Sequence, residues 1–168
     1  MYWLCLETYD VDCWDPIGYS ELDEIVDLAA KDADTLYALD YYGDVAMFDE
    51  YEWYEAVDSN VEYGWTIAVH ADHVLVGGCG GDVSYSDDGG ETFNKLEDIP
   101  VTADYTLVTV AFDSYFDANN TIYAAVAGFQ GSDPTTGGIY RWVIGESDEW
   151  EDLGVEDYAY TGLVLNVP

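Results

Sequence analysis

The chain has 168 residues, of which 36 are acidic and three are basic, so its formal net charge is −33. Hydrophobic residues make up 49% of the sequence and aromatic residues 16%, which excludes a disordered acidic tail and predicts one folded domain. Three basic side chains are too few for a phosphate-binding surface, and no run of about 20 apolar residues exists, so nucleic-acid binding and a membrane-spanning helix are both excluded.

The excess of carboxylates has three interpretations. At about one net charge per 250 Å² of surface, self-repulsion destabilises a compact chain, and about 1 M salt screens most of that repulsion. The first interpretation is therefore a solvated acidic surface in a protein that works in salt. The second is partial neutralisation by bound divalent cations such as Ca²⁺, and the third is a dedicated cationic partner.

The N-terminal segment lacks the basic flank of a signal peptide, and it matches residues 140–154, so we expect the chain to begin inside a repeat unit. Cys5 and Cys13 are symmetric about Tyr9 in an expected hairpin. Facing strands bring Cβ atoms within disulfide distance, so one hypothesis is a disulfide and the other is two half-buried thiols. The third cysteine, Cys79, lies among glycines, and we expect it to be a small buried strand residue.

Residues 20–31 fit a helix, but residues 24–30 fit an innermost strand equally well. After them come short β-branched runs separated by Gly, Asp and Asn, which predict strands. These runs lie at 66–70, 74–76, 107–112 and 121–126.

An aromatic residue recurs with a period near 40. The series is Trp14, Trp53, Phe93 and Trp150, with spacings of 39, 40 and 57. The longer last interval contains residues 129–138, whose Gly, Pro and Ser content predicts an inserted loop and a first candidate contact surface. A period near 40 with four strands per unit is typical of a propeller blade, so we expect an all-β fold of such blades with four antiparallel strands each. The expected units are a partial one at 1–18, whole ones at 19–58, 59–98 and 99–154, and a first strand of another at 155–168.

One unit contains a compact turn motif. It has the pattern Ser-x-Asp-x-Gly-x-Thr-Phe, formed by Ser86, Asp88, Gly90, Thr92 and Phe93. Oxygens of Ser86 and Asp88 are suited to bind nearby backbone N–H groups, and Phe93 is suited to fold back into the core. We therefore expect a structural turn, with a Ca²⁺ site at Asp87, Asp88 and Glu91 as the alternative.

This pattern resembles the Asp-box, or bacterial neuraminidase repeat. The resemblance covers residues 20–165, and the stretches at 110–113, 120–125 and 137–141 also look like blades of that superfamily. Similar propellers include sialidases, xyloglucanase-type glycosidases, the sortilin ectodomain and photosystem II assembly factors. The resemblance implies a β-propeller of a secreted or cell-surface protein, with the box on an outer hairpin away from the central site.

Three whole units are few for a closed propeller. The chain is a fragment of a larger ring, or its two ends meet to close a four-bladed ring, or two chains complete one ring. Open blade edges also favour self-association.

The residue content limits the enzymatic hypotheses. Sialidases hold the substrate carboxylate with three arginines, and this chain has only Arg141, for which a salt bridge or aromatic stacking is expected. A two-carboxylate glycosidase is the alternative, with Asp113 as one candidate, although Asp113 also fits a turn. His70 and His73 lack an obvious third metal ligand. We therefore expect a non-catalytic recognition or scaffolding segment that binds a protein or glycan through exposed aromatic residues, with no certain cofactor other than the Ca²⁺ alternative.

Overall fold

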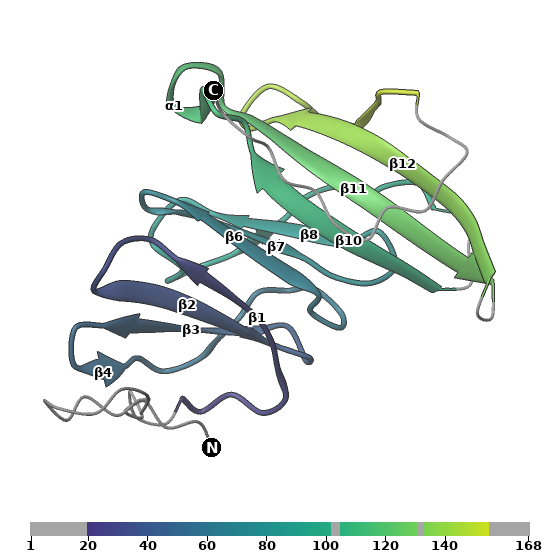
Figure 1. Ribbon diagram of the computed structural model, residues 1–168. Helices are drawn as coiled ribbons and strands as arrows, with labels where there is room; N and C mark the ends of the chain where they lie inside the picture. The colour runs from purple at the N-terminus through teal and green to yellow at the C-terminus, as the bar shows by residue number, and fades with distance from the viewer. Residues whose placement is uncertain (1–19, 102–104, 131–132, 155–168) are drawn as a thin grey trace, which may run out of the picture.

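The computed structural model describes residues 20–101, 105–130 and 133–154. They form an all-β structure of three antiparallel sheets, each made of strands that follow one another in the chain (Figure 1). Among these residues no helix has the length and apolar character to cross a bilayer. The all-β class and the antiparallel pairing expected from the sequence are confirmed.

The first sheet has the order β1-β2-β3-β4, and β5 also pairs with β3. Its strands are β1 (Ile25–Ala30), β2 (Thr35–Asp40), β3 (Asp44–Asp49), β4 (Glu52–Trp53) and β5 (Val57–Asp58). The strand alternative for the segment around β1 is therefore confirmed and the helix alternative is wrong. Burial in β1 alternates, with Asp27 and Ala29 partly covered and their neighbours exposed, which is the period of a strand.

The second sheet has the order β6-β7-β8-β9 and lies between the other two (Figure 1). Its strands are β6 (Thr66–His70), β7 (His73–Gly77), β8 (Val83–Ser86) and β9 (Asn94–Lys95). Both faces of this sheet are covered, which explains the uninterrupted apolar run in β7. Val74 and Val76 pack with the first sheet, whereas Leu75 packs with the third.

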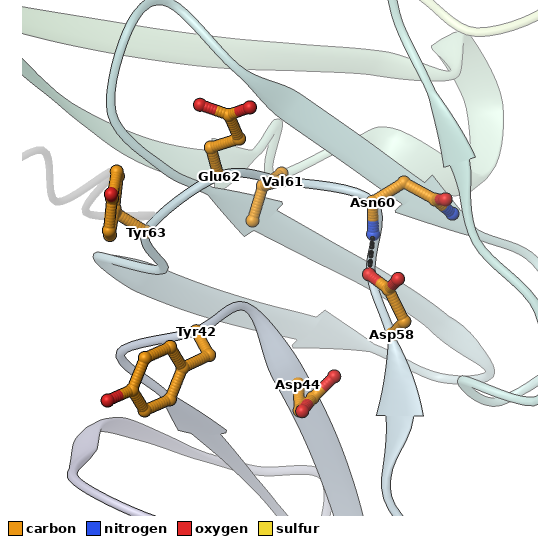
Figure 2. A pocket seen from close by; sticks show the side chains of 7 residues that line it. All are labelled: Tyr42, Asp44, Asp58, Asn60, Val61, Glu62 and Tyr63. Atoms are coloured by element: carbon orange, nitrogen blue, oxygen red, sulfur yellow. Dashed lines mark hydrogen bonds between the residues drawn. The ribbon is translucent and has the colours of Figure 1, made fainter.

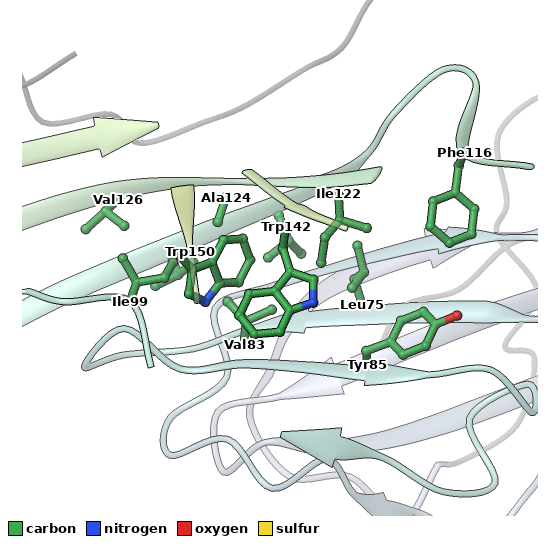
Figure 3. Close-up of a cluster of buried hydrophobic side chains, with 12 residues drawn as sticks. Leu75, Val83, Tyr85, Ile99, Phe116, Ile122, Ala124, Val126, Trp142 and Trp150 are labelled. Carbon is green, nitrogen blue, oxygen red and sulfur yellow. The ribbon is translucent and has the colours of Figure 1, made fainter. Parts of the chain in front are cut away.

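The third sheet has the order β10-β11-β12-β13. Its strands are β10 (Tyr105–Phe112), β11 (Thr121–Gln130), β12 (Asp133–Val143) and β13 (Glu151–Asp152), with the short helix α1 (Phe116–Asn119) between the first two. The apolar cluster between the second and third sheets contains Trp142 and Trp150, whose rings lie 5.3 Å apart (Figure 3). Most of its other members are aliphatic strand residues, so this interface is built from alternate positions of facing strands.

The expectation of an inserted loop at 129–138 is wrong. β11 continues to Gln130 and β12 begins at Asp133, and these two residues are partners in the ladder. Pro134 is the ladder partner of Phe129, and the register of the two strands shifts between Gly128 and Phe129. A bulge of this kind accommodates a proline within a ladder, which the composition of the segment alone did not indicate.

Side chains of the first strands join neighbouring sheets. Asp27 Oδ2 accepts the backbone N–H of Ile67 at 2.9 Å, which links β1 to β6. Thr66 Oγ1 donates to the carbonyl of Val108 at 3.1 Å and accepts the N–H of Val110 at 3.2 Å, which links β6 to β10. The first strands of the three sheets therefore lie side by side, with β6 in the middle.

Candidate functional site

Half-exposed tyrosines gather where the β2–β3 turn meets the segment that leads into β6. Two adjoining cavities open there, with volumes of about 440 and 480 Å³. We call the first one the tyrosine recess. Its walls come from Tyr42, Asp44, Asp58, Asn60, Val61, Glu62 and Tyr63 (Figure 2). The second cavity shares Glu62 and Tyr63 with it and extends to Cys79 and Tyr105.

A buried carboxylate holds the backbone of the β2–β3 turn. Asp40 is 2% exposed, and its Oδ1 accepts the N–H groups of Tyr42 at 2.9 Å and of Asp44 at 3.0 Å. Gly43 has φ of +90°, and a Cβ there would come within 2.4 Å of the Val61 carbonyl. Only glycine fits this close approach, so the turn holds Tyr42 at the rim of the recess.

The opposite wall is a connecting segment anchored to both sheets. Ser59 Oγ donates to the Gly43 carbonyl, and the Gly64 N–H donates to the Tyr41 carbonyl at 3.0 Å. On the other side, the Glu62 N–H donates to the buried Asp82 at 3.0 Å. These bonds hold the wall in place without a ligand.

Two residues of this wall have left-handed backbone conformations. Asn60 has φ of +63° and Tyr63 has φ of +57°. Such a conformation is unusual for a bulky aromatic residue and costs on the order of 1–3 kcal/mol. Strained residues of this kind concentrate at functional sites, and here one of them sets the position of a ring that lines the recess.

Three tyrosine rings form the aromatic part of the site. The Tyr41 ring lies 5.5 Å from that of Tyr42 and 5.1 Å from that of Tyr63, measured between centroids. Tyr42 is 58% exposed and Tyr63 47%, so both rings keep free surface beside the recess. Aromatic side chains exposed in this way are suited to stack on a ligand.

The recess is also acidic. Asp44 and Asp58 are directly opposite each other in the β3–β5 ladder, where like charges repel. Burial raises the pKa of Asp44 above its usual value, and the charges of Asp40 and Asp58 raise it further. Asp58 Oδ1 accepts the N–H of Asn60 at 2.7 Å, which occupies part of its hydrogen-bonding capacity.

The second cavity contains a cation that is already paired. Lys95 Nζ lies 2.9 Å from Asp82 and 3.1 Å from Asp98. Cys79 is half-buried in the β7–β8 connection rather than buried in a strand, so the expectation for it is wrong. Its backbone forms an isolated bridge to Leu107. Burial raises the pKa of the Cys79 thiol, and burial together with a hydrogen bond to that thiol raises the pKa of Tyr105 to about 12.

The turn after β8 is held by its own side chains. Ser86 Oγ donates to Asp88 Oδ1 at 2.7 Å and accepts the N–H of Gly90 at 2.9 Å. Asp88 also accepts the Thr92 N–H at 2.9 Å and the Thr92 hydroxyl at 2.6 Å, and these bonds lower the pKa of Asp88 to about 2. Tyr37 of the first sheet donates its hydroxyl to the Gly89 carbonyl at 3.1 Å, so the turn is attached to the neighbouring sheet.

The aromatic residues of the repeat occupy comparable places. Trp53 is in β4, and Phe93 and Trp150 immediately precede β9 and β13. Phe93 and Trp150 are each 8% exposed and lie in the two apolar clusters between sheets. Trp14, Cys5 and Cys13 lie outside the described residues.

The catalytic and metal candidates from the sequence do not form a site: His70 and His73 are partners in the β6–β7 ladder, but their ring nitrogens contact different groups. His70 Nε2 lies 2.8 Å from Asp117, whereas His73 Nδ1 lies 2.6 Å from the Tyr85 hydroxyl. Asp113 organises a turn, and hydrogen bonds, first that from the Tyr115 N–H, lower its pKa. Within the described part of the chain no group of three or more His, Cys, Asp or Glu is placed to hold a metal ion, and this includes the acidic residues of the Ser86–Phe93 turn.

Arg141 has the expected role, since its Nε donates to Glu151 at 2.9 Å across β12 and β13. Sequence reasoning missed the tyrosine recess, although it expected exposed aromatic residues to be the contact groups. The available signal was Tyr41-Tyr42-Gly43, two aromatic residues before a turn glycine, followed about 20 residues later by Tyr63-Gly64-Trp65.

Comparisons with known proteins bear on the fold alone. No protein-family model matches the chain, and no curated protein matches it. Among solved structures it is similar to the crystal structure of the computationally designed Ika4 protein, with a TM-score of 0.61 and 15% sequence identity. The similarity covers 89% of this chain and 88% of the designed one.

Proposed function

We propose that this chain is a non-catalytic recognition module made of β-propeller blades from a secreted or cell-surface protein, and that the tyrosine recess is its binding surface. The observation that carries the proposal is a cavity of about 440 Å³ lined by Tyr42 and Tyr63, whose rings both contact the ring of Tyr41 in the wall of the adjoining cavity. Cavities of this size accommodate small ligands, and exposed tyrosines with acidic neighbours provide both stacking and hydrogen-bond acceptors.

Three features support the interpretation of the sheets as blades. Each sheet contains four strands paired in chain order, with β5 as an extra strand of the first. The sheets pack face to face through apolar clusters, and their first strands lie side by side. The hydrogen bonds of the Ser86–Phe93 turn fit the structural role that the Asp-box resemblance implies.

Completion of the ring is part of the same proposal. The first and third sheets each pack on one face of the second sheet. Further blades come from a longer protein, from the two ends of this chain or from another chain. The residues that line the recess belong to the β2–β3 turn, to β3 and β5, and to the segment before β6.

A ¹⁹F NMR experiment tests the binding surface. The chain is labelled with 3-fluorotyrosine, and Tyr→Phe variants assign the resonances. The probes are cellohexaose, chitohexaose, a xyloglucan oligosaccharide and an octalysine peptide. We expect a saturable shift confined to Tyr41, Tyr42 and Tyr63, and we expect Tyr42→Ala to abolish it.

Tyr51, which is 86% exposed in another turn, supplies the control. Tyr51→Ala should leave binding unchanged. Equal losses in Tyr42→Ala and Tyr51→Ala would contradict the proposal, and so would shifts spread evenly over all tyrosines.

The second candidate is a glycoside hydrolase of the Asp-box type, favoured by the facing carboxylates of Asp44 and Asp58. Facing residues have Cβ atoms about 5 Å apart, and retaining glycosidases hold their two carboxyl groups about 5 Å apart. The raised pKa of Asp44 suits a general acid. Release of reducing ends from xyloglucan, abolished by Asp44→Asn, would favour this candidate over simple recognition.

A further inference from the structure

We infer that the tyrosine recess binds a small organic cation with an alkylated ammonium group, an inference that rests on the proposed recognition function and names its ligand class. The inference depends on where the carboxylates, the basic side chains and the aromatic rings of this chain lie relative to one another.

The carboxylates of the recess have no Lys or Arg partner. The chain has three Lys and Arg residues in total, and each forms an ion pair elsewhere. Lys31 pairs with Asp72 at 2.7 Å, and Lys95 and Arg141 are bound to the acidic groups described above. Asp44 and Asp58 therefore face each other across the ladder without a Lys or Arg to offset their mutual repulsion, which a bound cation would relieve.

The rings favour an organic cation over a metal ion. Ammonium groups bind to the faces of tyrosine rings within about 6 Å of the centroid. Tyr42 and Tyr63 come from the two walls of the recess, one from the β2–β3 turn and one from the segment before β6 (Figure 2). A hard ion such as Ca²⁺ needs six to eight oxygen ligands, and the described carboxylates, those of the recess included, are not grouped in threes that could hold a metal ion.

The walls are preorganised for this contact. Tyr63 keeps its left-handed backbone because Glu62 on one side and Gly64 on the other are hydrogen-bonded to Asp82 and to Tyr41. The Tyr42 turn is fixed by Asp40. Because the rings are already in place, little binding free energy is lost to ordering them when a ligand binds.

The experiment compares choline with 3,3-dimethylbutan-1-ol, which has the same shape without the charge. Both are titrated into the 3-fluorotyrosine-labelled chain at a constant ionic strength kept with NaCl. We expect choline to shift the Tyr42 and Tyr63 resonances saturably and to bind about tenfold more tightly than the alcohol. Tyr42→Phe should retain binding because the ring remains, and Tyr42→Ala should lose it.

Two double variants separate the local carboxylates from the general negative charge. Asp44→Asn with Asp58→Asn removes repulsion from the ladder, should fold at least as stably as the parent, and should weaken choline binding about tenfold. The control variant, Asp148→Asn with Glu149→Gln, also removes two negative charges, but from the exposed turn before Trp150. It should change choline affinity less than about twofold.

The outcomes distinguish the ligand class from the recognition function. Equal affinities of choline and the alcohol at Tyr42 and Tyr63 would overturn the cation inference and leave recognition standing. A shift with cellohexaose or another oligosaccharide, but none with choline, would do the same. If the two double variants weaken choline binding equally, choline affinity depends only on the overall charge of the chain, and the inference is overturned. Failure of choline and of every panel probe to move these resonances would overturn both proposals.

Discussion

Replacement of Asp88 by asparagine should destabilise the fold, whereas the same replacement at Asp87 should not. The Asp88 carboxylate accepts three hydrogen bonds, two from Thr92 and one from Ser86. An asparagine keeps one acceptor oxygen and places an NH₂ group against these donors. Asp87 is exposed, and its replacement removes a negative charge from a chain of net charge −33 and thereby relieves repulsion.

The magnitude follows from the lowered pKa of Asp88. A pKa shift from 3.8 to about 2 corresponds to a contribution of roughly 2.5 kcal/mol to the free energy of unfolding. Because Asp88 is exposed, solvent screening reduces this contribution, and we expect about 1 kcal/mol. For a chain of this size that lowers Tm by about 2–4 °C. Asp87→Asn should leave Tm unchanged or raise it slightly.

The pH dependence of stability provides a second test of the role of Asp88. Since the folded-state pKa of Asp88 is depressed, its contribution is present above the unfolded-state value near 3.9 and is lost as pH falls through about 2. The difference in unfolding free energy between parent and Asp88→Asn, measured by urea denaturation in high salt, should therefore shrink between pH 4 and pH 2. Equal Tm changes for the two variants, or a difference that persists at pH 2, would refute the assigned role of the carboxylate.

Three further predictions concern the whole chain, the turn glycines and the thiol. Thermal stability should rise strongly between about 0.05 and 1 M NaCl, because screening of the −33 charge outweighs weakening of the surface ion pairs; an unchanged Tm would contradict this. Gly43→Ala should cost about 2 kcal/mol or more in urea unfolding, whereas Gly80→Ala, with φ of +73° but no atom within 4 Å of its added Cβ, should cost only about 1 kcal/mol. In a variant with serine at Cys5 and Cys13, Cys79 should react with DTNB at pH 8 about tenfold more slowly than free cysteine, because burial raises its pKa; a rate equal to that of free cysteine would contradict its half-buried position.

Features that depend on nearby residues were predictable from the sequence. The bonds of the Ser86–Phe93 turn connect residues two and four positions apart, so the pattern of side chains predicts which oxygens bind which N–H groups. Strands β7 and β10 were recognisable from their β-branched residues. The ambiguity of β1 arose because most of its apolar residues are exposed while Asp27 is partly covered, so its hydrophobic pattern does not mark the covered face.

Features that depend on contacts between distant segments were not predictable in this way. The tyrosine recess combines the β2–β3 turn with a segment about 20 residues later, and the β3–β5 ladder and the hydrogen bonds of Ser59 and Gly64 bring the two together. The β11–β12 extension was missed because Gly, Pro and Ser predict a loop from local preference, while the ladder partners at Gln130 and Asp133 stabilise strands instead.

Salt should act in opposite directions on the stability of the chain and on its binding of a cation. Repulsion among 33 net charges extends over the whole surface, so it is removed as the Debye length falls from about 10 Å at 0.1 M to about 3 Å at 1 M. An ammonium group against the rings of Tyr42 and Tyr63 is in direct contact, where screening is weaker, so high salt should remove only the long-range part of the attraction. We therefore expect choline affinity to fall only modestly between 0.1 and 1 M NaCl while Tm rises. This result would indicate a specific binding site rather than general attraction to an acidic surface. A complete loss of affinity at 1 M would indicate general attraction alone.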